Sequence, residues 1–504
     1  MSIDRPDART LIDLTLDPGS FDSWDTDARQ PDVGEEYARQ LVEARERTGV
    51  TEAVVTGAGT LNGHPVAVIV GEFGFLAGSI GTVAADRITA ALRRATAERL
   101  PVLAAPVSGG TRMQEGTAAF TRMVDITAAV VDHKAAGLLY LVYQRHPTTG
   151  GVFASWGSLG HITVAQPGAL IGFLGPKVYA ALHGREFPPG VQSAENLLAH
   201  GLVDAVLEPR HLRPMIARVL SIVAAPETPT PVDAPSPAGD EPDAWDAVLI
   251  SRRPGRPGVR TLLRLAATDV VPLSGTSEGE TEKASTVSLA RIGDHGVVVV
   301  GLDRHAQSFD GPLGPGALRQ ARRGMALAAE LGLPLVTIID TPGAALSREA
   351  EEGGLGGEIA RCLAALIMLP VPTVSVIMGQ GTGGAALALL PADRVIAARH
   401  GWLAPLPPEG ASVIRHGDIE HAAAMARAQG ITAHQLHRQG LVDAVVDERP
   451  SAELEPEQFC RRLGEQIRAQ ITHARNADIA GRATRRARHA QPFRIDEEVD
   501  HARS

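Results

Sequence analysis

The six-residue string GLVDAV occurs twice in the chain, at Gly201–Val206 and again at Gly440–Val445. Other segments match at a similar separation: RLPVLAAPVSGG at 99–110 matches GLPLVTIIDTPG at 332–343, and TTGGVFAS matches GTGGAALA. The separations drift from 230 residues (301 − 71) to 239 residues (440 − 201). Such a drift indicates an internal duplication with small insertions. The alternative is that two unrelated halves use similar turns in similar elements.

Both halves follow the same order of predicted elements. A short β-rich run is followed by an Ala-rich helix, an apolar strand, a Gly-rich turn, a second helix, and another strand that ends in a Gly-Gly turn. The runs are 66–70 and 297–300, the first helices 83–100 and 316–331, and the second helices 124–134 and 359–369. Strands that alternate with helices predict an α/β fold with buried, largely parallel strands. Each half is therefore predicted to be one α/β domain.

The two halves are separated by a Pro-rich, acidic stretch, APETPTPVDAPSPAGDEPD at 225–243. Proline lacks an N–H and fixes φ, so this composition is typical of a linker. We therefore expect an N-terminal half at 1–235 and a C-terminal half at 236–485. A charged tail at 486–504 is expected to be disordered, with fraying from Gly481 onward. The polar stretch SGTSEGETEK at 274–283 predicts a mobile loop.

The composition excludes several classes of protein. Among 504 residues, 48 Lys and Arg against 58 Asp and Glu give a net charge of −10, which disfavours binding to nucleic acid or to an anionic membrane surface. Two cysteines exclude a disulfide framework and a Cys-rich zinc site, and we expect no metal. The first residues, MSIDRPDART, contain no apolar segment, so we expect no secretory signal. The uncharged run 362–392 contains prolines and glycines, so we interpret it as a buried strand and helix. We expect a cytoplasmic protein.

Glycine-rich turns after strands are the candidate sites. Ser108-Gly109-Gly110 follows an apolar strand, and its amides predict either an oxyanion hole or only a tight turn. PTTGGV at 147–152 and GQGTGGA at 379–385 have the same character. The latter also matches the dinucleotide pattern G-x-G-x-x-G, but the first acid, Asp393, comes nine residues after Gly384 instead of about 20, which disfavours NAD. The chain has no Walker-type G-x-x-x-x-G-K-[ST] motif.

Longer motifs make a resemblance specific. FGFLAGSIG, SGGTRMQEG, PTTGGV, IGFLGPK and FPPGVQSAENLLAHGLVDAVL resemble the β subunit of bacterial acetyl-CoA carboxylase carboxyltransferase. TPGA, AEEGGLGGEIAR, VPTVSVIMGQGTGGAALAL and PPEGASVI resemble its α subunit, and LIDLTLDPGSF at 11–21 resembles the start of fused acyl-CoA carboxylase β chains. The resemblance covers about residues 10–475. It implies two tandem crotonase-like (ββα spiral) domains related by internal duplication.

The resemblance implies transfer of CO2 from carboxybiotin to the α-carbon of an acyl-CoA. The first candidate reaction is the conversion of acetyl-CoA to malonyl-CoA in fatty acid biosynthesis. It implies that the amides of Gly109 and Gly110 hold the thioester enolate oxygen. The amides of Gly384 and Ala385 would hold the biotin ureido oxygen. The expected substrate-binding residues are Arg112, Gly150, Gly151, Lys177 and Gly383.

Partners are implied in the same way. The chain has no MKM biotinylation motif and no ATP-grasp-like segment, so the biotin carboxyl carrier protein and the biotin carboxylase are expected on other chains. In this family the paired oxyanion holes face each other across two chains, which implies a homodimer or a higher homo-oligomer.

Three departures from the family leave the acyl substrate open. The four-cysteine zinc ribbon of bacterial β subunits is absent, TPGAYP is replaced by TPGAAL with Ala345 in the aromatic position, and GFAGPR ends in Lys177. Two other functions stay open beside the carboxyltransferase: a biotin-independent malonyl-thioester decarboxylase and a non-catalytic assembly subunit.

Overall fold

The computed structural model describes the chain except for residues 1–4, 27–33, 225–239, 478–479 and 488–504. The chain divides into two compact units: Met1–Leu220 with Leu273–Glu280, and Ser221–Pro272 with Thr281–Ser504. Most of the predicted linker and the tail from residue 488 lie outside the described residues. The division predicted at 235/236 stays a prediction, and contacts place the boundary of the units just after Leu220.

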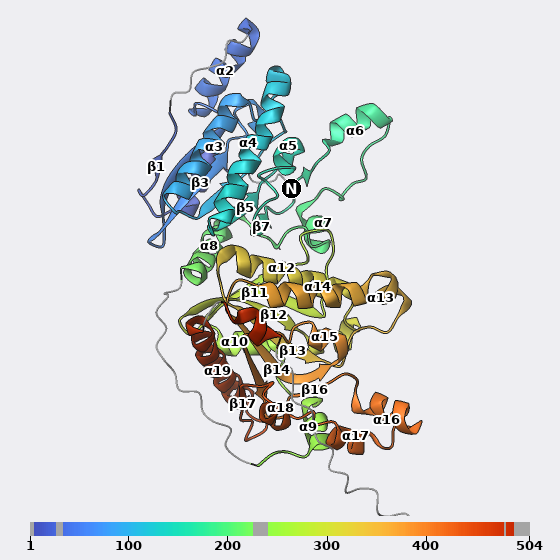
Figure 1. The fold of residues 1–504 in the computed structure, drawn as a ribbon. Helices are drawn as coiled ribbons and strands as arrows, with labels where there is room; N and C mark the ends of the chain where they lie inside the picture. Colours follow the sequence, from blue (N-terminus) through green and yellow to red (C-terminus); the bar gives the residue numbers. More distant parts are fainter. Residues whose placement is uncertain (1–4, 27–33, 225–239, 478–479, 488–504) are drawn as a thin grey trace, which may run out of the picture. The chain divides into compact units, whose positions relative to one another are not determined.

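The first unit is built on a seven-stranded sheet with α3 (Thr82–Ala97) and α4 (Gly116–Ala135) packed on one face (Figure 1). Its strands lie in the order β1 (Asp22–Ser23), β2 (Val54–Leu61), β3 (His64–Gly71), β4 (Val102–Ala105), β5 (Tyr140–Gln144), β7 (Ile162–Ala165) and β9 (Ala205–Val206). β1, β2 and β3 pair antiparallel, and every later pair is parallel.

Shorter elements complete the first unit. They are α1 (Ala8–Thr15), α2 (Glu35–Thr48), η1 (Leu76–Gly78), η2 (Met113–Glu115), the paired strands β6 (Thr148–Thr149) and β8 (Ile171–Gly172), α5 (Gly150–Phe153), α6 (Pro176–His183), α7 (Ala194–Ala199) and α8 (Pro209–Val223), whose last residues belong to the second unit. α5 follows β6 directly, so the Gly-Gly turn predicted from PTTGGV becomes the first turn of a short helix.

The second unit repeats this architecture. Its main strands lie in the order β10 (Asp269–Leu273), β11 (Ser285–Ile292), β12 (His295–Leu302), β13 (Leu335–Thr341), β14 (Thr373–Thr382), β15 (Arg394–Ala398) and β17 (Ala444–Val446), and β16 (Trp402–Ala404) pairs with the end of β14. β11 and β12 are antiparallel, and β12 to β17 pair in parallel. α12 (Pro315–Leu331) and α14 (Leu355–Met368) cover one face, and α10 (Val259–Ala266) and α19 (Pro456–Asn476) cover the other (Figure 1).

The remaining helices of this unit lie around the sheet edges and loops. They are α9 (Ala244–Ser251), α11 (Arg304–Asp310), α13 (Arg348–Glu352), α15 (Gly383–Leu387), α16 (Pro408–His416), α17 (Ala422–Ala428), α18 (Ala433–Arg438) and α20 (Arg482–Arg486). Among the described residues, no helix is long and apolar enough to cross a membrane.

The duplication predicted from GLVDAV is confirmed by the matching strand orders, and it extends to single hydrogen bonds. Asp204 of the first copy accepts the backbone N–H of Thr163 (2.9 Å), and Asp443 of the second accepts that of Val395 (2.6 Å). In each unit the carboxylate thereby fixes the start of the strand beside it, β7 or β15. The two copies of the string therefore supply a carboxylate acceptor at the same place in both sheets.

The polar stretch at 274–283 does not behave as its composition predicts. Residues 273–280 belong to the first unit, where Ser274 donates its N–H to Asp204 (3.1 Å) and Ser277 donates its N–H to the Gly201 carbonyl (2.9 Å). The stretch is therefore tied to the GLVDAV turn by backbone hydrogen bonds, which a polar composition cannot reveal.

The fraying expected from Gly481 onward is also wrong for α20. The Arg486 side chain is fully buried, and its guanidinium donates to the carbonyls of Leu366 (3.2 Å), Leu369 (2.5 Å) and Val371 (2.6 Å). It also pairs with the buried Asp393 at 2.8 Å. Arg486 thus satisfies carbonyl oxygens at the end of α14 that the helix itself leaves without donors.

Replacing Arg486 with alanine should destabilise the second unit. The change leaves these carbonyls without their donor and removes a buried partner of Asp393, so we expect the free energy of unfolding to fall by about 3–5 kcal/mol, measured by urea denaturation. R461A removes only an exposed pair with Glu457 and is the matched control. Equal stability of R486A and R461A would contradict this role.

Candidate active site

Each unit brings a Gly-containing turn next to the first turn of a short helix. In the first unit these are Ser108–Gly110, after β4, and α5. A Cβ built on Gly150 would lie 3.4 Å from the Gly110 Cα, and one on Gly151 would lie 3.0 Å from the Thr111 hydroxyl. The structure therefore places four of the predicted site residues together. Only glycine permits this approach at Gly150, where φ is +62°.

The amides of Gly109 and Gly110 already have acceptors in the structure. Gly109 donates to the Ala77 carbonyl at 2.9 Å, and Gly110 donates to the Ser108 hydroxyl at 3.0 Å. Holding an enolate oxygen would require exchange of these bonds, so the role assigned to the pair stays a prediction. The Gly150 amide donates to the Phe173 backbone carbonyl at 3.1 Å. The amide of Gly151 comes next in the first turn of α5, where a helix supplies no acceptor of its own.

Arg112 is buried behind this turn. Its guanidinium forms a two-pronged ion pair with Glu52 (2.6 and 3.1 Å) and donates to the Ser79 carbonyl (2.6 Å) and to the Tyr37 hydroxyl (3.2 Å). The side chains of Arg112 and Glu52 are 0% and 1% exposed. The guanidinium therefore fixes the turn against the Ser79 loop, and its predicted contact with substrate stays a prediction.

Glu115 reinforces the same corner of the first unit. Its carboxylate accepts the backbone N–H of Thr82 at 2.6 Å and the Tyr37 hydroxyl at 2.5 Å. The start of α3 and the 108–116 segment are thus held by one carboxylate. Lys177 occupies the second position of α6, and its side chain lies outside the described part of the chain.

The second unit contains a cavity at its own Gly-Gly turn. It has a volume of about 410 Å³. Its lining residues are Gly383, Gly384, Leu387, Leu403, Ala404, Pro405, Gln429, Gly430, Leu436, Gln439 and Leu441. A Cβ on Gly384 would lie 2.7 Å from Ile359 Cδ1, and Gly383 has φ +68°. The positive φ favours glycine at Gly383, a Cβ at Gly384 would require the Ile359 side chain of α14 to move, and the buried Ala385 follows in the same turn.

Buried charges lie beneath this turn, and sequence reasoning missed them. The fully buried Asp340, at the end of β13, accepts the backbone N–H of Gln380 at 3.1 Å and pairs with Arg304 at 3.1 Å. Burial raises the pKa of Asp340, and Arg304 and Arg256 oppose that rise. Arg252 donates to the Gln380 side chain (3.1 Å) and to Glu409 (3.1 Å). The signal available in the sequence was an acid directly after an apolar strand, in IIDTPG.

A second buried ion pair, between Arg256 and Glu448, holds Arg256 in place. Arg256 forms a fully buried, two-pronged ion pair with Glu448, which also accepts from His400 (3.0 Å). Burial acts to raise the pKa of Glu448, but Arg256 and His400 hold it at about 2. The carboxylate is thus a permanent anchor for the segment after β17 and takes no part in proton transfer near neutral pH.

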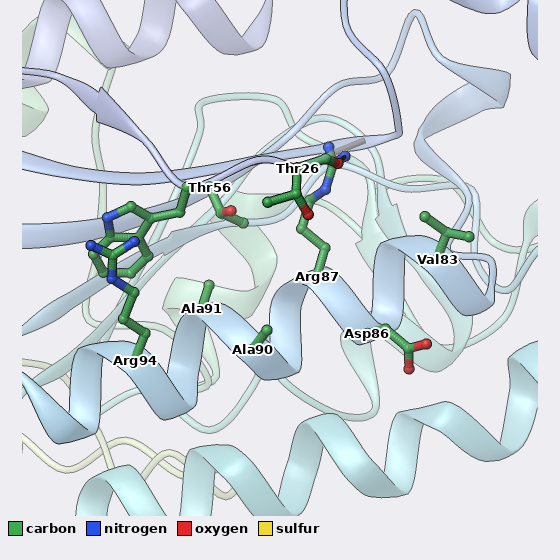
Figure 2. Close-up of a pocket in the computed structure, with 9 residues that line it drawn as sticks. Thr26, Thr56, Val83, Asp86, Arg87, Ala90, Ala91 and Arg94 are labelled. Atoms are coloured by element: carbon green, nitrogen blue, oxygen red, sulfur yellow. Dashed lines mark hydrogen bonds between the residues drawn. The ribbon is translucent and has the colours of Figure 1, made fainter. Parts of the chain in front are cut away.

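A second cavity, of about 370 Å³, lies away from the predicted site residues. Trp24, Thr26, Thr56, Arg87 and Arg94 are among its lining residues, and Figure 2 shows Arg87 extending from α3 toward Thr26 and Arg94 extending from the same helix. The Arg94 guanidinium carbon lies 4.4 Å from the Trp24 ring centroid. None of the predicted site residues lines this cavity.

The sequence GTSEG at 275–279 matches the G-x-S-x-G pattern of serine hydrolases, but the structure does not form a catalytic serine turn there. Ser277 is exposed with φ +66°, and its segment runs from β10 to β11 without a helix. A nucleophile elbow requires a strand-to-helix turn, so this pattern forms an ordinary turn.

The two sheets of matching strand order have the fold expected of two tandem crotonase-like domains. A family profile described as "Carboxyl transferase domain" matches residues 5–480, so the chain belongs to the carboxyl transferase family. The solved structure of transcarboxylase 12S, described as a hexamer assembly, superposes with a TM-score of 0.75 at 21% identity over 98% of this chain and 92% of that one.

The relatives narrow the class to the carboxyltransferase subunits of biotin-dependent acyl-CoA carboxylases. The probable biotin-dependent acyl-coenzyme A carboxylase beta3 subunit of Mycobacterium tuberculosis (strain ATCC 25618 / H37Rv) is 58% identical over 92% of this chain and 93% of that protein. The acetyl-coenzyme A carboxylase carboxyl transferase subunits beta/alpha of Salinispora arenicola are 38% identical over 93% of this chain and 87% of that protein.

A double-mutant cycle can test whether Arg112 stabilises the fold through its ion pair with Glu52 or binds substrate. R112A should lower the free energy of unfolding by about 3–5 kcal/mol, because it leaves Glu52 buried without its partner. E52A/R112A should lose less than the sum of the two single changes. A raised KM for acyl-CoA with unchanged stability would instead identify Arg112 as a substrate-binding residue.

Proposed function

We propose that the chain transfers a carboxyl group from carboxybiotin to the α-carbon of a short acyl-CoA, with acetyl-CoA and its product malonyl-CoA as first candidates. The observation that carries the proposal is the duplication itself: each unit presents backbone amides at the first turn of a short helix, α5 or α15. Two oxyanions form in this reaction, one on the thioester and one on the urea. One set of fixed donors is needed for each.

The residues of the second unit fit a bicyclic urea. The cavity beside Gly383 and Gly384 has leucine walls for an apolar ring. We propose that the amides of Gly384 and Ala385, in the first turn of α15, donate to the urea oxygen. When bound, carboxybiotin supplies CO2 and a nitrogen basic enough to take the acyl α-proton. The chain then needs no acid–base dyad of its own.

The first unit is proposed to hold the acyl-CoA. We propose the Gly151 amide as a donor to the thioester oxygen, since the amides of Gly109 and Gly110 already donate to the Ala77 carbonyl and the Ser108 hydroxyl. Each oxyanion donor contributes typically about 3–4 kcal/mol to catalysis. Lys177 and Gly150 stay proposed substrate contacts, and Arg112 is proposed to position the turn.

The same proposal assigns partners. The biotin carboxyl carrier protein and the biotin carboxylase are on other chains, and the active oligomer is at least a homodimer in the cytoplasm. The relatives are named as acyl-CoA or acetyl-CoA carboxylase subunits, which supports this assignment over the decarboxylase and the assembly subunit.

The test is a direct assay with matched variants. The purified chain, carboxylated carrier and acetyl-, propionyl- or butyryl-CoA should give the carboxylated acyl-CoA. A385P removes one first-turn N–H without removing an intrahelical bond, so kcat should fall by about 100–1,000-fold. G356A is the control, because a Cβ there meets nothing within 4 Å, and it should turn over like the wild type.

The outcomes separate the candidate functions. Biotin-independent release of CO2 from malonyl-CoA would favour the decarboxylase. No product with any short acyl-CoA, from a folded oligomer supplied with active carrier, would favour the assembly subunit.

A further inference from the structure

The helix α4 is apolar on two faces, and the described part of the chain covers only one of them. One face packs against α3 and the sheet in the core of the first unit. On the other face, Phe120, Val124 and Val131 lie within about 40° of one another around the helix axis, and they are 62%, 69% and 54% exposed. A helix that is apolar all round is normally buried all round. A partner is therefore expected to cover these three side chains, which we call the α4 face.

The helix α14 occupies the corresponding place in the second unit and carries a complementary surface. Ala360, Ala364 and Met368 are exposed on one side of it, and we call these three residues the α14 face. The charged side chains of this helix are Glu358 and Arg361. The two alanines leave a shallow groove along α14, in which the larger side chains of the α4 face find room to pack.

We infer that the α4 face of one copy of the chain packs antiparallel on the α14 face of a second copy. The inference rests on the proposed function, which requires at least a homodimer. Twofold symmetry forms the contact twice, because α14 of the first copy then meets α4 of the second. Both faces are thereby covered, and the buried area doubles towards the roughly 1,200–2,000 Å² of a stable interface.

Charges at the edges of the two faces set the direction of packing. Asp125 and Asp132 each come one residue after a member of the α4 face, so they lie about 100° round the helix from it. Arg361 comes one residue after Ala360 and lies at the same angle from that member of the α14 face. An antiparallel pair brings these edges to the same side, where opposite charges meet, whereas a parallel pair separates them. Two α4 faces packed antiparallel on each other would bring acid to acid.

The Gly-Gly turns supply a register for the contact. A Cβ built on Gly151 would lie 3.5 Å from Met123 Cγ of α4, and one built on Gly384 would lie 2.7 Å from Ile359 Cδ1 of α14. Each turn is therefore level with one known position of its helix. Placing these two positions at the same height brings the Gly-Gly turn of one copy level with that of the other, as transfer between the two sites requires.

The same register pairs the groups that complement each other. With a rise of 1.5 Å per residue, Val124 and Ala360 come within about 3 Å along the helix axes, and Asp125 and Arg361 within about 6 Å. An arginine side chain spans the latter separation. Arg361 now pairs with Glu358 at 2.8 Å, and Glu358 also has ion pairs with two arginines of α12. Arg361 therefore turns to Asp125 without leaving Glu358 unpaired.

Cross-linking tests the contact in the full chain. V124C/A360C should form a disulfide between chains under mild oxidation, seen as a species of twice the chain mass on a non-reducing gel. V124C and A360C alone should not cross-link, because the two native cysteines are buried. A cross-link in V124C alone would show that α4 meets α4, and a disulfide within one chain would place both helices in the same copy. Either result, or a folded V124C/A360C oligomer that does not cross-link, would overturn the inference.

Association measured by sedimentation provides a second readout. F120S should raise the Kd of the dimer at least about 30-fold, with an unchanged circular dichroism spectrum, because Phe120 is exposed in the single chain. L454S makes a comparable change at a residue 72% exposed outside both faces and should associate like the wild type. D125R and R361D should each raise the Kd about 10-fold, and D125R/R361D should return it to within about threefold of the wild type.

Two results separate failure of the contact from failure of the proposed function. Wild-type association in F120S, or a D125R/R361D chain that associates more weakly than both single variants, would overturn the inference. An oligomer that cross-links through V124C/A360C, while the wild-type chain transfers no carboxyl group to any short acyl-CoA, would overturn the proposed function alone.

Discussion

Asp340 lies at the end of β13 with its carboxylate fully buried, and its hydrogen bond to the Gln380 amide sets the path of β14 into the glycine turn. A buried carboxylate is costly to desolvate, so it is tolerated only with close partners. Arg304 is one, at 3.1 Å, and Arg304 in turn donates to the carbonyl of Arg256, which is anchored on Glu448. Burial of this carboxylate costs desolvation free energy, and the hydrogen bond that it accepts fixes the position at which α15 begins.

In the first unit, buried charges hold the other glycine turn, Ser108–Gly110 after β4, which corresponds to 341–343 in the second unit and not to the turn before α15. Arg112, next to this turn, forms a buried ion pair with Glu52, which lies 60 residues earlier in the chain. What the duplication preserved is the backbone course and the Asp204 and Asp443 acceptors, while the buried charges differ between the halves. This difference is compatible with the proposed function, in which the two sites would bind different oxyanions on a similar backbone.

The repeat made the α/β class predictable, because both halves show the same alternation of strands and helices, whereas the crotonase-like arrangement was implied by the family resemblance and not by the repeat. Helices 83–100 and 316–331 are confirmed as α3 and α12 within a few residues. Contacts between residues distant in sequence could not be predicted. The arginine-rich segment after Gly481 was expected to fray, yet Arg486 donates hydrogen bonds to carbonyls at the end of α14. Likewise, the sequence places amides at Gly109 and Gly110 but cannot show that Ala77 and Ser108 already occupy them.

The G-x-G-x-x-G pattern of the second unit has a packing explanation at each glycine. A Cβ on Gly379 would lie 2.5 Å from the Asp340 carboxylate, and one on Gly381 would lie 2.6 Å from the Trp402 carbonyl. A side chain at the first position would displace the carboxylate that orients Gln380, and one at the second would push β16 away from β14. β16 supplies Leu403 and Ala404 of the cavity wall, and Pro405 follows it. The close pairing of β14 with β16 that Gly381 permits therefore helps to set the distance between the first turn of α15 and that wall.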